Sequence, residues 1–185
     1  WNYDDENQET FGREGPGMTP DPITFSPDAV TEAVIEMVED TFPDAPGDAA
    51  GFGWPVTPEE AEAALDDFIE NRLPTFGTYQ DAMWTGRAFL YHSLLSCALN
   101  LKLLDPETVV RRAEDAYEQG HAPINAVEGF IRQVLGWREF VRGVYFFYGP
   151  EYVDRNSLGA QLPLPPLFWT GDTNMRCLAD VMGQL

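Results

Sequence analysis

Apolar residues recur with a helical period between Pro123 and Tyr148. At about 100° per residue they fill two adjacent stripes and leave a narrow polar edge, a pattern typical of a buried helix. The first stripe consists of Ile131, Val134, Val141 and Tyr145, and the second of Phe130, Trp137, Phe140 and Val144. The polar edge consists of Glu128, Arg132, Glu139 and Arg142. Two polar residues, Gln133 and Arg138, fall inside the stripes. We therefore expect them to have partners, either core side chains or the polar edge of a ligand.

Capping signals predict where two further helices begin. Ser26, which precedes a proline, predicts a helix that ends at Phe42. Thr57 and Glu60 form a capping box, which opens a helix to about Arg72. The residues that these two helices should bury are Val30, Val34, Ile35, Val38, Ala61, Ala64, Leu65, Phe68 and Ile69.

The remaining pattern is also helical. Asp105 is predicted to cap a helix that ends at Gly120, and Asp172 a last helix that continues to the end of the chain. Residues 73–78 interrupt the pattern, and residues 151–166 are predicted to be a proline-rich loop. No segment alternates with the period of a strand, so the predicted fold class is all-α.

Length and composition favour a single domain. With 185 residues and 44% apolar content the chain can bury a core. Residues 1–25 are predicted to be a linker or surface arm, and residues 26–185 a helical domain. Because the chain starts at Trp1 and its last predicted helix runs to Leu185, we expect a piece of a larger protein. No apolar run has the length of a membrane span and no signal peptide is recognisable, so we expect no membrane partner and a cytoplasmic location.

The charge is strongly negative. A net charge of -20 comes from 31 acidic and 11 basic residues, and Lys102 is the one lysine. Such a surface repels phosphate backbones, which taken alone argues against nucleic-acid binding. Two interpretations remain open. Adaptation to molar salt is favoured because the acids are spread through the helices, and an acidic binding tail is the alternative.

Several chemical signatures are missing: there is no phosphate loop, no GxSxG, no HExxH and no zinc-spaced cluster. Asp66 and Asp67 are predicted to be solvated carboxylates on a helix edge. Cys97 and Cys177 form no CxxC pair, and buried thiols are the simpler interpretation.

Two polar groupings in apolar segments are compatible with a ligand. Ser93 and Ser96 either bond their own helix backbone or donate to a pyrophosphate. Trp137 beside Arg138 suits either an interior salt bridge or a planar anionic ring system.

These residues carry a resemblance. The segment FIRQVLGWREF at 130–140 resembles the flavin-binding helix of the photolyase and cryptochrome family, and 91–100 followed by LLDPETVV is similar to that family's phosphate-binding segment. Four longer motifs resemble one branch of it, the prokaryotic iron-sulfur photolyases, also called deoxyribodipyrimidine photolyase-related proteins. They are TFGTYQDAM, HSLLSCALN, INAVEGFIRQVLGWREFVRG and FWTGDTNMRCL, and WNYDDEN at the start is similar to that branch's linker.

The resemblance implies specific roles. It implies that residues 26–185 are part of an FAD-binding domain. Trp137 would border the cavity for a flipped DNA lesion, and Trp169 would lie on the electron-transfer route to the flavin. Cys177 would be one of four ligands to a four-iron four-sulfur cluster. The residues implied to hold FAD are Tyr79, His92, Ser93, Leu94, Ser96, Gln133, Arg138 and Glu139. Two positions depart from the family pattern, since Cys97 stands where a proline is usual and His92 replaces a threonine; Cys97 is expected in the core.

The implied function is light-dependent DNA repair, in which reduced FAD donates an electron to a pyrimidine dimer or a (6-4) photoproduct. The implied partners are UV-damaged DNA, an N-terminal α/β domain with an antenna chromophore, and further C-terminal helices that complete the pocket. We expect this chain alone to be inactive. Arg132, Arg138 and Arg142 are the candidate DNA contacts. Two alternatives remain: a cryptochrome-type photoreceptor, and a helical interaction domain without a cofactor.

Overall fold

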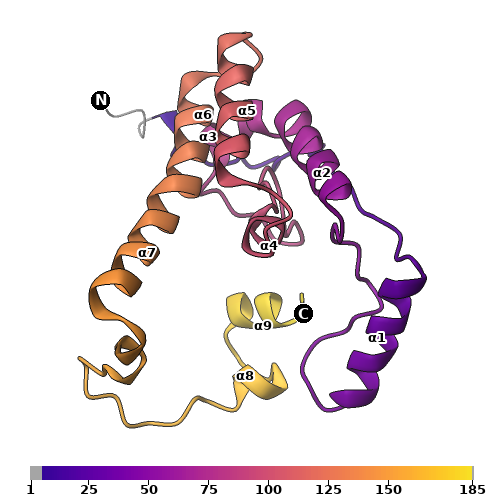
Figure 1. The fold of residues 1–185 in the computed structure, drawn as a ribbon, viewed down its shortest axis with the longest axis vertical. Helices are drawn as coiled ribbons and strands as arrows, with labels where there is room; N and C mark the ends of the chain where they lie inside the picture. The colour runs from indigo at the N-terminus through magenta and orange to yellow at the C-terminus, as the bar shows by residue number, and fades with distance from the viewer. Residues whose placement is uncertain (1–5, 185) are drawn as a thin grey trace. The chain divides into compact units, whose positions relative to one another are not determined.

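The computed structural model describes residues 6–184, and residues 1–5 of the WNYDDEN motif and Leu185 lie outside the described range. The elements are α1 (Ala29–Thr41), α2 (Pro58–Asn71), α3 (Leu73–Tyr79), α4 (Ser96–Asn100), α5 (Pro106–Glu118), α6 (Ile124–Ile131), the π-helix η2 (Arg132–Gly136), α7 (Trp137–Tyr148), the 3-10 helix η3 (Pro150–Asp154), α8 (Leu167–Thr170) and α9 (Arg176–Met182) (Figure 1). Within residues 6–184 the backbone forms no strand, and the all-α prediction is confirmed.

The chain divides into two compact units. The first unit comprises residues 1–25 and 55–150, and the second unit comprises residues 26–54 and 151–185. The residues predicted around the phosphates and the ring of FAD all lie in the first unit, whereas Trp169 and Cys177 lie in the second.

The core of the first unit lies where α2, α3, α5 and α6 pack on one another. Phe68, Phe76 and Phe130 meet at its centre, with the rings of Phe68 and Phe130 4.7 Å apart and that of Phe76 6.0 Å from each. The other buried members are Ala61, Leu65, Ile69, Leu73, Leu95, Ala98, Leu99, Leu104, Val109, Ala113, Ala116, Ala122, Val127 and Val134. The burial predicted for α2 is therefore confirmed.

The caps of α2 and α5 are also as predicted. The backbone N–H of Glu60 donates to the Thr57 hydroxyl, while the Glu60 carboxylate accepts from the Thr57 N–H. Asp105 caps α5 by accepting from the backbone N–H of Thr108 at 3.1 Å.

A short helix, α3, replaces the predicted interruption at residues 73–78. Proline and glycine suggested a break, but Pro74 lies in the first turn, where a missing N–H costs nothing. Gly77 faces α6 so closely that a Cβ would lie 2.5 Å from the Ala126 Cα. This glycine therefore permits a backbone contact between α3 and α6.

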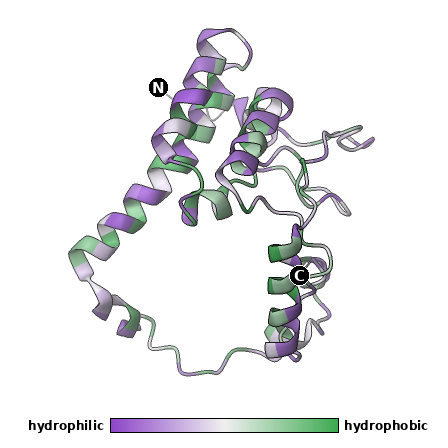
Figure 2. Cartoon of the chain, turned by 45° about the vertical axis from the view of Figure 1, so that its right-hand side comes forward, coloured by the Kyte–Doolittle hydropathy of each residue, from purple (hydrophilic) through white to green (hydrophobic). Residues whose placement is uncertain are grey.

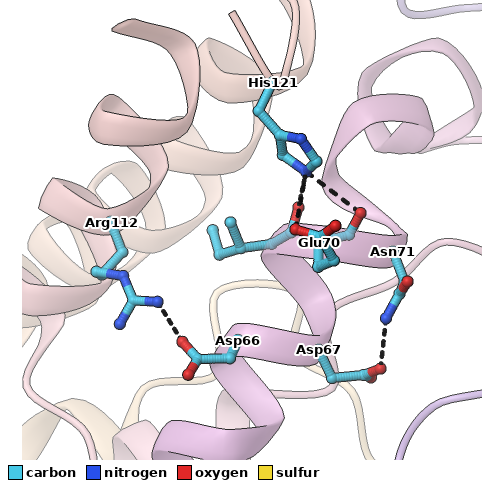
Figure 3. A network of polar contacts seen from close by, with 7 residues as sticks. Asp66, Asp67, Glu70, Asn71, Arg112 and His121 are labelled. Atoms are coloured by element: carbon cyan, nitrogen blue, oxygen red, sulfur yellow. Dashed lines mark hydrogen bonds and ion pairs between the residues drawn. The ribbon is translucent and has the colours of Figure 1, made fainter. Parts of the chain in front are cut away.

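Polar contacts join α2 to α5 and to the turn after α5 (Figure 3). The Arg112 guanidinium pairs with the Asp66 carboxylate. His121 Nε2 lies 3.1 Å from the Ile69 carbonyl oxygen and 3.3 Å from that of Glu70, so the ring can donate to carbonyls that the end of α2 leaves unpaired.

Asp67 differs from the solvated carboxylate predicted for it. It is partly buried and accepts from Arg72 Nη1 at 2.7 Å, from Asn71 Nδ2 at 2.9 Å and from the Ile23 N–H at 3.2 Å. Arg72 is 1% exposed and therefore needs this counter-charge. Burial raises the pKa of Asp67, but the hydrogen bonds and the charge of Arg72 outweigh it and lower the pKa below its usual value.

Part of the segment before α1 packs on the helices of the first unit. Asn7 is 1% exposed and exchanges two hydrogen bonds with Asn125 of α6. The Phe11 ring stacks on Tyr79 at 4.6 Å. Residues 7–11 are thus held against α3 and α6; the predicted division of the chain at residue 25 remains a prediction.

The second unit departs from the predictions at both of its longer helices. α1 starts at Ala29 rather than at Ser26, because the Asp28 carboxylate accepts from the Thr31 N–H at 2.8 Å. Its predicted core valines are exposed, Val30 by 71%. α9 is preceded by Met175 instead of being capped by Asp172, and it ends at Met182.

The long helix at residues 123–148 is not buried throughout. α6 and Val134 are buried, but α7 has no buried residue, and Trp137 and Phe140 are each 62% exposed. Hydrophobic and hydrophilic residues lie side by side along it (Figure 2). The prediction of a helix is therefore confirmed, but the inference that it is buried was wrong for α7.

Among residues 6–184, no helix combines the length and the apolar character needed to cross a bilayer.

Candidate functional site

A cavity of about 300 Å³ opens between α3, the loop after it, α4 and the long helix. Five of the residues predicted to hold FAD line it together: His92, Ser93, Ser96, Gln133 and Arg138. Phe76, Leu99, Phe130 and Val134 supply its apolar wall, and Gln80 and Asp81 add polar groups. The cavity thus combines an apolar wall with a few polar groups, as small-molecule sites do.

The π-helix η2 explains how Gln133 and Arg138 reach one cavity. Five residues apart, they would lie about 140° from each other around a regular α-helix. A π-turn closes between residues five apart, which brings such positions onto one side of the helix. Gln133 is consequently exposed to the cavity rather than buried in the core. The regular periodicity assumed from the sequence placed the two residues on different stripes.

Arg138 is held in position by α4. Its Nη1 donates to the Asn100 Oδ1 at 3.1 Å, which fixes the guanidinium at the cavity wall. Glu139, predicted beside it, points elsewhere and pairs with Arg142 at 3.4 Å on the exposed side of α7. Arg138 is therefore the cation among the residues that line this cavity.

The loop at residues 90–95 carries unusual backbone geometry. Leu90 and Leu94 have φ angles of 45° and 59°, in the left-handed region that non-glycine residues seldom adopt. These two residues flank His92 and Ser93, whose side chains line the cavity. Such strain is often found at binding sites. Leu94 contributes this backbone turn, and its side chain does not line the cavity.

His92 lies with its ring edge-on to Phe76, at 6.0 Å. Desolvation lowers the pKa of His92, and the nearby Asp81 carboxylate offsets part of that effect. A neutral imidazole is therefore the form favoured at neutral pH.

Tyr79 is not part of the cavity wall. Its ring lies between Phe11, at 4.6 Å, and Tyr91, at 5.9 Å. Burial raises the pKa of Tyr91, and the neighbouring Tyr79 adds to the effect. The rings of Phe11, Tyr79 and Tyr91 thus pack against one another next to the loop that carries His92, outside the cavity wall.

A second cavity, of about 580 Å³, adjoins the first along Gln80, Asp81 and Gln133. Trp137 and Phe140 line it with their rings perpendicular, 6.2 Å apart. Gln8, from the N-terminal segment, also lines it. No local pattern in the sequence pointed to Gln8, Gln80 or Asp81, although the motif TFGTYQDAM contains the last two.

Three further residues of the sequence predictions are exposed. Trp169 is 65% exposed on α8, and Cys177 is exposed on α9. Cys97 is also exposed rather than in the core, because the short α4 turns it outward. Within residues 6–184, no group of three or more potential metal ligands comes together.

Comparisons with known proteins give one family match and two similar proteins. Residues 1–54 match the family model described as deoxyribodipyrimidine photo-lyase-related protein. The chain is 47% identical over 182 residues to the (6-4) photolyase of Agrobacterium fabrum, in an alignment that covers 98% of this chain and 36% of the relative. It is 31% identical over 98 residues to the uncharacterized protein R853 of Acanthamoeba polyphaga mimivirus, covering 52% of this chain and 74% of that protein.

The chain spans about a third of the length of the photolyase that it matches. The identity extends over nearly all of its residues, including both cavities and the long helix. The chain is therefore similar to a (6-4) photolyase over nearly its whole length, and to the deoxyribodipyrimidine photo-lyase-related family over residues 1–54.

Proposed function

We propose that this chain forms part of a photolyase that repairs pyrimidine dimers or (6-4) photoproducts with light and reduced FAD. The observation that carries the proposal is the cavity in which His92, Ser93 and Ser96 face Gln133 and Arg138. The 47% identity to a protein named as a (6-4) photolyase supports the same assignment.

The residues around the cavity fit FAD. Ser93 and Ser96 offer hydroxyl donors to a pyrophosphate, and the neutral His92 ring adds a further polar contact. Arg138, already oriented by Asn100, would bond the polar edge of the isoalloxazine together with Gln133. Phe76 and Phe130 would exclude water from the ring. Bound reduced FAD supplies the electron, while these residues bind and orient it.

Three residues of the earlier assignment take lesser roles in this proposal. Tyr79 would support the phosphate loop through its stack with Tyr91, and Leu94 would shape it through its backbone. Glu139 would set the position of Arg142.

The adjoining second cavity would receive the damaged bases. Trp137, exposed on its wall, offers a surface on which a flipped base can stack. Trp169 would carry electrons to the flavin. The damaged DNA strand would be held by the arginines of the long helix, Arg132, Arg138 and Arg142.

A four-iron four-sulfur cluster needs four thiolates, and this chain contains two cysteines in all. Cys177 would be one ligand, with the other three supplied by a longer protein. In that protein an N-terminal α/β domain would carry the antenna chromophore, and further helices would complete the FAD pocket. We expect no repair by this chain alone under light.

FAD binding is tested most sharply at Ser96. An aspartate there would repel the pyrophosphate, so Ser96→Asp should weaken FAD binding at least about tenfold while changing riboflavin binding much less, because riboflavin has no phosphate. The measurement is titration of each flavin, followed by fluorescence, on the protein at its full encoded length. Ser157→Asp, in an exposed loop of the second unit, is the matched control.

The repair reaction is tested with a UV-damaged oligonucleotide under blue light. Restoration of the undamaged bases supports a photolyase. A protein that binds FAD but leaves the lesion intact is instead a photoreceptor. One that purifies colourless and cannot be reconstituted with FAD is a helical interaction domain, and the proposal is then wrong.

A further inference from the structure

Three glutamine side chains gather in the second cavity. Gln8 comes from the N-terminal segment, Gln80 from the residue after α3, and Gln133 from the π-helix. We call this space, with its aromatic residues Trp137 and Phe140, the carboxamide cavity. Three carboxamides from three separate segments meet at one space.

Two of these amide groups, those of Gln8 and Gln133, are available to a ligand. Within residues 6–184, the side chains of Gln8 and Gln133 form no hydrogen bond, and the Gln80 Oε1 is buried without a partner. The Gln80 Oε1 is enclosed beside Gly129 of α6, so the amide groups that a ligand can reach are those of Gln8 and Gln133, which are both exposed.

The position of Gln8 is fixed by its neighbours. On one side, the Asn7 Nδ2 donates to the Asn125 carbonyl oxygen at 3.1 Å, and the Asn125 Nδ2 donates to the Asn7 Oδ1 at 2.9 Å. On the other side, the Glu9 N–H donates to the Thr78 carbonyl oxygen at 3.2 Å. Gln8 is therefore held from both directions by helices α3 and α6.

Gly129 keeps this arrangement compact. A Cβ on it would lie 3.1 Å from both the Asn7 Nδ2 and the Gln80 Oε1. The anchor of Gln8 and the side chain of Gln80 thus pack on the same point of α6. The positions of Gln8, through Asn7, and of Gln80 therefore both depend on the absence of a side chain at Gly129.

The chemistry of the cavity matches a pyrimidine base with an intact imide edge. A carboxamide pairs with an imide through two hydrogen bonds, one accepted from the ring N3–H and one donated to a ring carbonyl. The perpendicular rings of Trp137 and Phe140 offer a flat face for stacking. The charged residues on this wall are Asp81 and Arg132, and Arg132 is paired with Glu128 at 3.4 Å.

We infer that Gln8 is a specificity-determining residue that bonds the imide edge of a flipped pyrimidine in the carboxamide cavity, and that Asn7 is its positioning residue. The inference rests on the proposed function, because the flipped base would come from damaged DNA. It assigns a direct role to the segment before α1, which was predicted from the sequence to be a linker or surface arm.

The experiment compares two single-stranded oligonucleotides that contain the same photoproduct, one of which is methylated at N3 of the 5′ pyrimidine. Methylation removes the donor that Gln8 would recognise and leaves the stacking surface almost unchanged. The full-length protein should bind the unmethylated photoproduct about tenfold more tightly, as expected for one lost hydrogen bond with a stranded partner.

The variants are Gln8→Ala and Asn7→Ala, with Gln161→Ala in an exposed loop of the second unit as the control. Both test variants should reduce the tenfold preference to threefold or less, whereas the control should keep it. Because Gln8 is exposed, Gln8→Ala should leave the thermal midpoint unchanged, which separates recognition from folding.

An unchanged preference in Gln8→Ala, or no preference in the unsubstituted protein that nonetheless binds the photoproduct, overturns the inference. Failure to bind the photoproduct more tightly than undamaged DNA contradicts the proposed function itself. The two failures are distinguished by the undamaged oligonucleotide.

Discussion

Replacing Gly77 with alanine is expected to push α3 away from α6. The added Cβ would lie 2.5 Å from the Ala126 Cα, 2.6 Å from its N and 2.9 Å from the Asn125 carbonyl carbon. All three are backbone atoms, so no side-chain rotation relieves the contact. Overpacking of this kind costs about 1–3 kcal/mol, and the rigid contact favours the upper end.

The intrinsic preference of a helix for alanine partly offsets this cost. A glycine-to-alanine exchange inside a helix stabilises by about 1 kcal/mol. The net expectation for Gly77→Ala is a free energy of unfolding lower by about 2 kcal/mol. With a urea slope of about 2 kcal/mol/M, the denaturation midpoint should fall by about 1 M.

Gly143→Ala is the matched control, because a Cβ on this helical glycine meets nothing within 4 Å. It should raise the unfolding free energy by about 0.5–1 kcal/mol. Urea titrations followed by circular dichroism measure both variants. If Gly77→Ala is as stable as Gly143→Ala, the close contact of α3 with α6 is refuted.

Three other predictions concern charge. Arg138→Gln should weaken FAD binding about tenfold or more through loss of a charged donor, with Arg111→Gln on α5 as an unaffected control in the same flavin titration. Asp67→Asn should lower the unfolding free energy by about 3 kcal/mol in urea titrations, because it leaves the buried Arg72 without a counter-charge. Since the folded pKa of Asp67 is depressed, its contribution to stability is present above the unfolded pKa of about 3.9 and is lost as the pH falls through the lower folded value; an acid-unfolding midpoint that Asp67→Asn leaves unmoved would contradict this. Arg142→Glu should weaken binding of damaged DNA about tenfold in high salt, where screening leaves mainly direct contacts; unchanged affinity in a filter-binding assay would place the DNA surface elsewhere.

Local signals in the sequence predicted the helices whose ends are set by local bonds. The Thr57 box and the Asp105 cap depend on contacts three residues away, so they can be recognised without tertiary structure. Asp28 caps the helix instead of Ser26, and both residue types are good caps, which explains the shift of two residues in the predicted cap.

Properties that depend on distant contacts were predicted less well. Helical periodicity identifies an apolar face but does not show what covers that face. The burial of α7 was therefore predicted wrongly, because α7 has no buried residue. The motifs predicted that His92 and Arg138 belong to one site, and the structure places both on one cavity. Gln8 escaped notice because its segment has no periodicity, and its position depends on Asn125, which is 117 residues further along the chain.

The π-helix η2 makes the site sensitive to the backbone geometry of one turn as well as to residue type. If the same five residues formed regular α-helical turns, every later side chain would rotate by about 100° relative to α6. Arg138 would then leave the cavity wall even with every side chain that lines it in place. A change that converts this turn to a regular α-helix is therefore expected to disturb the site far more than substitutions on the exposed side of α7.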